Sequence, residues 1–107
     1  MQYMVIARDG NDEGALERRM AAREDHIKVG DEYLKSGNFL MAVALLNDDQ
    51  EMIGSVMLVD FEGREELDAW LEVEPYVTGG VWKHVEFFPA KVGPSFEQFL
   101  PNKKQTA

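Results

Sequence analysis

The chain contains no cysteine, so neither a disulfide framework nor a thiolate site for zinc or an iron–sulfur cluster can form. Long hydrophobic runs are also missing. The longest, Phe39 to Leu46, is far shorter than the roughly 20 residues that a membrane-spanning helix needs. The first six residues carry none of the basic groups that a secretory leader would have. These absences predict a cytoplasmic protein without a membrane partner.

Positive charge is scarce. Eleven Lys and Arg stand against twenty Asp and Glu, which gives a formal net charge of −9, and such a surface repels nucleic acid and anionic lipid. One basic cluster, formed by Arg18, Arg19 and Arg23, is interleaved with acids such as Glu24 and Asp25. That mixture is typical of a solvated helix face, so we expect no nucleic-acid partner.

Metal and cofactor motifs are lacking as well. The two histidines, His26 and His84, are far apart and belong to no pattern with metal-ligand spacing. No phosphate-cradling glycine loop and no nucleophile elbow occurs. We therefore expect neither a metal nor a cofactor.

What is present is a clear succession of elements. β-Branched and aromatic runs predict four strands, and helix formers with apolar spacing predict two helices. The strands are expected at residues 3–8, 39–46, 53–61 and 81–88, and the helices at 13–35 and 63–73. The order βαββαβ predicts an α+β, ferredoxin-like domain at residues 1–90, with both helices on one face of a four-stranded antiparallel sheet. Residues 91–107 form a polar tail, either in contact with a partner or disordered.

Apolar spacing also predicts which faces turn inward. Leu16, Met20, Ile27 and Leu34 recur at close to helical period, which predicts one core-facing stripe along the first helix. Alternation in the last strand predicts that Trp82 lies on the face opposite Val85 and Phe87.

The second and third strands are apolar at almost every position, whereas a sheet with one wet face should alternate apolar and polar residues. Something must therefore cover the face of the sheet that the helices leave bare. A second copy of the chain is the simplest cover, so we predict a homodimer.

Two segments carry a resemblance to a known family. Arg23-Glu24-Asp25-His26 lies in the first helix, and Glu74-Pro75-Tyr76 leads through Gly79-Gly80-Val81 into the last strand. With these motifs the chain resembles the YciI-like (YCII-related) family over residues 1 to about 90. The resemblance implies a dimeric α/β barrel built from two ferredoxin-like sheets, with a pocket between helices and sheet in each subunit. A few members look like lyases or dehydrochlorinases of substituted aromatic rings, with a His–Asp pair as the suspected catalytic element.

This chain departs from the family pattern in two places. Glu74 stands where the family typically has aspartate, which lengthens the carboxylate by one methylene group and predicts a looser pair. Ala42-Val43-Ala44 stands where the family typically reads Ala-Gly-Pro. A β-branched side chain there predicts a smaller or differently shaped pocket.

His26 and Glu74 are the candidate catalytic pair, and Arg19, Arg23 and Tyr76 are the candidate substrate-binding residues. On a helical wheel Arg19, Arg23 and His26 fall within about one sixth of a turn, on the border of the apolar stripe. Imidazole titrates near neutral pH, arginine binds carboxylates in a fork, and an acid can orient the imidazole. The alternative is structural: His26 packs at the helix border, the arginines pair with nearby acids, and Glu74 faces solvent before Pro75.

Three functions of different class stay open. The first is a cofactor-independent lyase or isomerase that uses His26 as general acid and base on a small anionic or phenolic molecule. The second is a small-molecule binding or accessory module, with a pocket but no close pair between His26 and Glu74. In the third, the fold serves association alone. His84 is expected to be a satisfied interface histidine, and Asp60 a turn residue.

Overall fold

The computed structural model describes residues 1–100 of the chain, and its elements follow the predicted order. They are β1 (Gln2–Asp9), α1 (Ala15–Ser36), β2 (Phe39–Leu46), β3 (Met52–Asp60), α2 (Arg64–Val73), α3 (Pro75–Thr78), β4 (Trp82–Ala90) and the 3₁₀ helix η1 (Pro94–Phe99). The short helix α3 was not predicted. It forms because Pro75 suits the first position of a helix and the Glu74 side chain caps its N-terminus.

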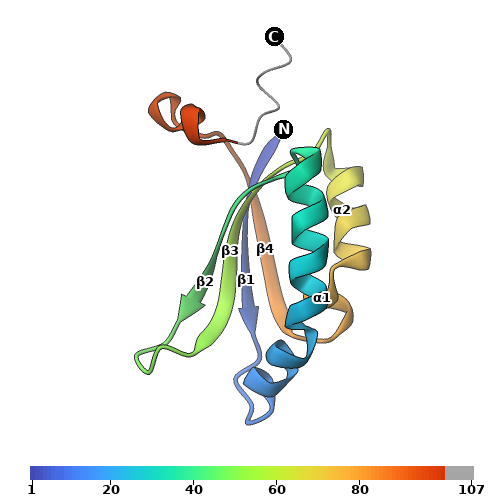
Figure 1. The fold of residues 1–107 in the computed structure, drawn as a ribbon, viewed down its shortest axis with the longest axis vertical. Coiled ribbons are helices and arrows are strands. Elements are labelled where there is room, and N and C mark those ends of the chain that lie inside the picture. Colours follow the sequence, from blue (N-terminus) through green and yellow to red (C-terminus); the bar gives the residue numbers. More distant parts are fainter. Residues whose placement is uncertain (101–107) are drawn as a thin grey trace.

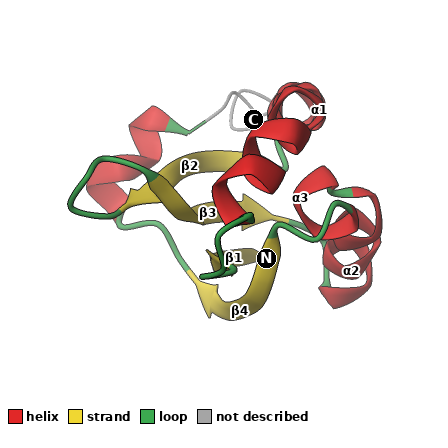
Figure 2. Cartoon of the chain, turned by 90° about the horizontal axis from the view of Figure 1, so that it is seen from below, coloured by secondary structure: helices red, strands yellow, loops and turns green. Residues whose placement is uncertain are grey.

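The strands form one antiparallel sheet in the order β2-β3-β1-β4. Figure 1 shows α1 and α2 side by side on one face of this sheet, and Figure 2 shows the same two layers from below. The predicted ferredoxin-like fold is therefore confirmed. Its two helices leave the other face of the sheet uncovered by the chain's own elements.

Local sequence explains where α1 and α2 end. Gly37 has φ of 86°, in the left-handed region that glycine adopts without strain, and its N–H donates to the Leu34 carbonyl. Pro75 cannot continue α2, which ends at Val73. Both ends match the predictions within one or two residues.

The core lies between the sheet and the helices and is rich in aromatic rings. Trp70 of α2 is fully buried and packs against Phe39 and Phe61, with ring centroids 5.1 and 5.9 Å apart, and Tyr33 of α1 stacks on Phe39. Burying such large side chains supplies much of the free energy of folding.

The core-facing side of α1 differs from the prediction. Met20, Ile27 and Leu34 of the expected stripe are all exposed, while the fully inward position belongs to Arg19. Ala22, Val29 and Tyr33 complete the packed side. α1 is rotated about its axis relative to the prediction, because the polar groups of Arg19 and His26 find partners on the side that packs against the rest of the domain, as described below.

The prediction for Trp82 was also wrong. Alternation placed it away from Val85 and Phe87, but it is buried and packs edge-on against Trp70 and Tyr76 on the helix side. The cause is a bulge in the β1–β4 ladder: Arg8 pairs with His84, and the next residue pairs with Trp82. The extra residue in β4 reverses the alternation.

The uncovered face of the sheet is apolar. Two rows of directly paired residues cross it, because paired side chains point to the same face. One row is Met41, Leu58, Met4 and Phe88, and the next is Val43, Val56, Ile6 and Glu86. Met41, Val43 and Phe88 are exposed. We call these eight residues the bare face.

The tail begins with η1, which projects on the side of the sheet away from the helices (Figure 1). Its Phe96 and Phe99 are exposed, with ring centroids 6.4 Å apart. The rest of the tail, residues 101–107, lies outside the described residues. Among residues 1–100, no helix is long and apolar enough to cross a membrane.

Candidate active site

Glu74 is a fully buried carboxylate at the junction of α2 and α3. Its Oε1 accepts a hydrogen bond from Trp70 Nε1 at 3.0 Å, one helical turn earlier, and its Oε2 accepts from the backbone N–H of Tyr76 at 3.1 Å. Oε2 also lies 2.5 Å from Nδ1 of His26. A charge so deeply buried is tolerable because these N–H groups solvate it in place of water.

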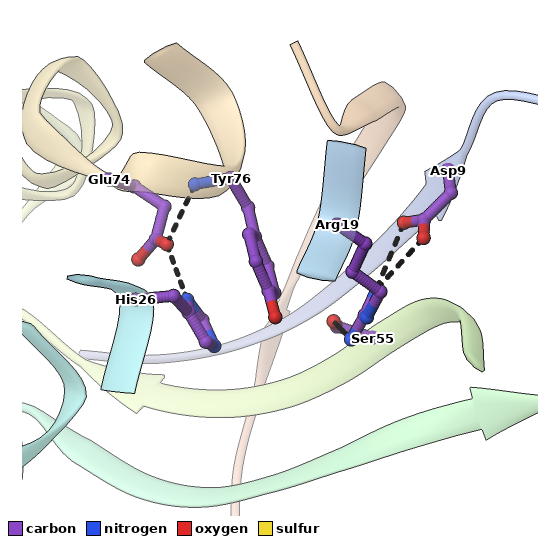
Figure 3. A network of polar contacts seen from close by, with 6 residues as sticks. All are labelled: Asp9, Arg19, His26, Ser55, Glu74 and Tyr76. Atoms are coloured by element: carbon purple, nitrogen blue, oxygen red, sulfur yellow. Dashed lines mark hydrogen bonds and ion pairs between the residues drawn. The ribbon is translucent and has the colours of Figure 1, made fainter. Parts of the chain in front are cut away.

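His26 comes from the middle of α1 and is partly buried. A carboxylate can only accept hydrogen bonds, so with Glu74 as a carboxylate Nδ1 is the donor in this contact, and a neutral ring then carries its lone pair on Nε2. Figure 3 shows the free end of the ring pointing away from Glu74, toward the strands. The pair is closer than the longer Glu74 side chain led us to expect.

Tyr76 lies between His26 and Arg19 (Figure 3). The imidazole stacks on the phenol ring, with centroids 3.8 Å apart and planes at 10°, and Cζ of Arg19 lies 4.6 Å from the phenol centroid. Burial raises the pKa of Tyr76, which Arg19 and Arg23 oppose. The phenol therefore keeps its proton at neutral pH and can donate a hydrogen bond.

Arg19 is held by Asp9, at the end of β1. Its Nη1 donates to both carboxylate oxygens at 3.0 and 3.1 Å, and its Nη2 donates to Oγ of Ser55 at 2.9 Å. Both charged side chains are almost completely buried. Burial raises the pKa of Asp9, and the neighbouring Arg19 and Arg18 oppose that shift. The Arg19 charge is thus matched within the protein.

A cavity of about 280 Å³ opens beside these residues, and we call it the polar cavity. Arg19, Arg23, His26, Ser55 and Tyr76 are its polar lining residues, and β2 contributes Ala42, Val43 and Ala44. Within residues 1–100, Arg23 has neither an ion-pair partner nor a hydrogen bond from its side chain, and it is exposed. The structure thus gathers all five candidate residues, with Glu74 behind His26 and the other four at the cavity.

The remaining titratable candidates lie elsewhere. His84 is exposed on β4, 3.8 Å from Glu86, and Asp60 accepts a hydrogen bond from the N-terminal amine at 3.2 Å. Within the described part of the chain, no group of three or more His, Asp or Glu side chains is placed to hold a metal ion.

Sequence reasoning missed three residues that complete the site: Trp70, Asp9 and Ser55. The position of Trp70 four residues before Glu74, at the end of one helix, is the signal that could have indicated their contact. Asp9 and Ser55 come from separate strands and gave no signal in the sequence.

A protein-family model for the YCII-related domain matches residues 1–91. The chain belongs to this family. Two curated relatives of this YCII-related chain are the proteins named YciI of Escherichia coli O6:H1 and Shigella flexneri, each 31% identical over 97 residues. The alignment covers 85% of this chain and 97% of each relative.

A solved structure also resembles this YCII-related chain. It is the 5-chloro-2-hydroxyhydroquinone dehydrochlorinase TftG from Burkholderia phenoliruptrix AC1100, in complex with 2,5-dihydroxybenzoquinone. The two superpose with a TM-score of 0.75, over 89% of this chain and 98% of TftG, at 19% sequence identity. At that identity the similarity establishes the fold.

Proposed function

We propose that this YCII-related chain is a cofactor-independent enzyme of the lyase or isomerase type, which moves a proton on a small anionic or phenolic molecule. One observation carries the proposal: His26 lies 2.5 Å from a fully buried Glu74 and at the edge of the polar cavity. A carboxylate in that position fixes the imidazole tautomer and stabilises the imidazolium that forms when the ring takes a proton.

In this proposal Nε2 of His26 takes a proton from a carbon or hydroxyl of the substrate and returns it to a second atom or to the leaving group. Tyr76, whose raised pKa keeps it protonated, donates a hydrogen bond to a substrate oxygen. Its ring also holds the imidazole from the side by stacking.

Arg23 is the cation that attracts the substrate, since its exposed charge has no acidic partner among the described residues. Arg19 lines the same cavity, but Asp9 matches its charge. We therefore assign Arg19 to positioning Tyr76 and Ser55, with substrate contact through the edge of its guanidinium group.

We also propose that two copies associate through the bare face, as the family resemblance implies. Exposed Met41, Val43 and Phe88 support this assembly, since a contiguous apolar patch on a sheet is an unusual surface for a monomer. The cytoplasmic location stays a prediction of the sequence.

The proposal is tested by incubating the purified protein with a panel of small phenols and aromatic carboxylates and following their consumption by chromatography. The hydroxylated and chlorinated ring named for TftG makes substituted phenols a reasonable start. His26→Gln should lower turnover of any active compound by about 100-fold or more, because general acid–base catalysis contributes about 10²–10⁴-fold.

His84→Gln is the matched control, since His84 is exposed on β4 and outside the cavity. It should leave turnover unchanged. If panel members bind but none is consumed, or if His26→Gln is as active as the parent, the enzyme assignment fails. The chain would then be the alternative, a non-catalytic binding or accessory module.

A further inference from the structure

A second cavity adjoins the polar cavity between α1 and β2. Its volume is about 270 Å³, and it shares His26, Ile27, Ala42 and Met57 with its neighbour. Because these four residues line both spaces, the two cavities lie next to each other at His26. We call this second space the apolar cavity.

The two cavities differ in chemistry. The polar cavity presents Arg23, Ser55 and Tyr76, whereas the apolar cavity is lined mainly by carbon, with Leu34 and Leu40 among its walls. Its one acidic lining residue, Asp31, is exposed and lies five residues along α1 from His26. A molecule that spans both spaces therefore meets a cation near one end and a carboxylate near the other.

Gly30 leaves open space in the wall of the apolar cavity. It lines the cavity from the middle of α1, and a Cβ atom added there would meet nothing within 4 Å. Glycine inside a helix costs about 0.5–1 kcal/mol relative to alanine, and its φ is not in the left-handed region, so neither helix stability nor backbone strain requires it. The absent side chain leaves open space beside His26.

From the adjacency of these two cavities we infer that the ligand of the His26 site is amphipathic, with an anionic or phenolic head in the polar cavity and an uncharged hydrocarbon tail in the apolar cavity. The inference rests on the proposed function and adds the substrate class. Arg23 selects the head, Leu34 and Leu40 bury the tail, and Asp31 disfavours a second negative charge at its far end. Short dicarboxylates are accordingly poor ligands.

A small ligand suits the apolar cavity better than a segment from a second copy of the chain. The imidazole of His26 lines the apolar cavity, and a protein segment lying there would block the access of substrate to the imidazole. Most of the bare face, which is the better surface for a second copy, lies on the other side of the sheet, and only its β2 residues Met41 and Val43 also border the cavities. Together the two cavities fall in the usual volume range of small-molecule sites, about 300–1,000 Å³.

Benzoate and 4-hexylbenzoate make a direct test, because both carry the same anionic head and only the second carries a hydrocarbon tail. Their dissociation constants are measured by isothermal titration calorimetry with the full chain. We expect the hexyl compound to bind at least about tenfold more tightly, since each buried methylene group strengthens binding. Amide chemical shifts should change at Gly30, Leu34 and Leu40 with the hexyl compound, and not at Met4 or Ile6, which lie on the bare face and line neither cavity.

Gly30→Leu should fill the apolar cavity. It should abolish the advantage of the hexyl compound and leave benzoate binding within about twofold of the parent. Gly30→Ala is the matched control, because one methyl group leaves most of the space and should preserve most of the advantage. Arg23→Ala should weaken both compounds by the same factor, because it acts on the shared head.

Each other outcome is decisive. Equal affinity of the two compounds for the parent overturns the inference and leaves the proposed function standing. If neither compound binds, the inference also falls, because no benzoate head enters the polar cavity, whereas the proposed function is then decided by the phenols of its own panel. If Gly30→Leu weakens benzoate as much as the hexyl compound, or changes the oligomeric state in sedimentation velocity, the tail does not occupy this cavity and the inference is wrong.

Discussion

Glu74 illustrates how one buried side chain organises a site. It ends one helix, caps the next and accepts hydrogen bonds from Trp70, Tyr76 and His26. The three donors come from three different helices, so the carboxylate links α1, α2 and α3. The extra methylene group relative to aspartate does not prevent the contact with His26.

Glu74→Gln should destabilise the fold as well as the site. The amide has one acceptor oxygen in place of two, so at least one of the three N–H donors loses its partner in a buried place. An unsatisfied buried polar group costs about 1–3 kcal/mol, and we expect the free energy of unfolding in urea to fall by that amount. Glu72→Gln, exposed on α2, should change it by less than about 0.5 kcal/mol. Equal losses in the two variants would contradict this account.

At the residue scale the sequence identified His26 and Glu74 through the family motifs, and the structure brings them together. It could not identify Asp9 or Ser55, because their role depends on where two strands pass beneath one arginine. Side-chain partners that come from distant elements leave no periodic signal along the chain.

At the scale of elements, α1 shows why hydrophobic spacing alone misleads. Its apolar stripe of Met20, Ile27 and Leu34 is exposed, and Arg19 takes the innermost position. Arg19 can be buried there because β1 and β3 supply Asp9 and Ser55 as partners. Helix boundaries, which depend on local residues such as Gly37 and Pro75, were predicted well. The orientation of the helix depends on distant contacts and was not.

The Arg19–Asp9 contact between α1 and β1 should affect how the free energy of unfolding depends on pH. Burial raises the folded pKa of Asp9 above its ordinary value of 3.8. The folded protein therefore binds the proton of the Asp9 carboxyl group more tightly than the unfolded chain does. The resulting stabilisation is fully present below pH 3.8 and is lost as the pH rises through the folded pKa. Relative to Asp9→Asn, the free energy of unfolding of the parent should fall with pH across that window in urea titrations.

Asp12→Asn gives a control of opposite sign. A hydrogen bond from Arg18 lowers the pKa of the exposed Asp12, so its stabilising effect is present above 3.8 and lost as pH falls. Parallel slopes for the two variants would show that burial of Asp9 does not govern its titration.

At the scale of the whole molecule, the order of elements was sufficient to predict the fold. Two βαβ-type crossings with a central hairpin place both helices on one face of the sheet. The other face is then uncovered, and the apolar residues at almost every position of β2 and β3 indicated in the sequence that it is apolar. The bulge that turns Trp82 inward was not predictable, because an extra residue in a ladder depends on the partner strand.

The last prediction concerns the bare face. Val43 is 53% exposed on it, and Val73 is 55% exposed at the end of α2, so the two valines are matched in type and exposure. If two copies associate through the bare face, Val43→Glu buries an unpaired charge in each copy. The dissociation constant of the dimer in sedimentation velocity should then rise by about 100-fold or more. Val73→Glu should leave it unchanged. A parent that stays monomeric at high concentration, or a Val43→Glu variant that associates like the parent, would mean that the bare face is covered in some other way.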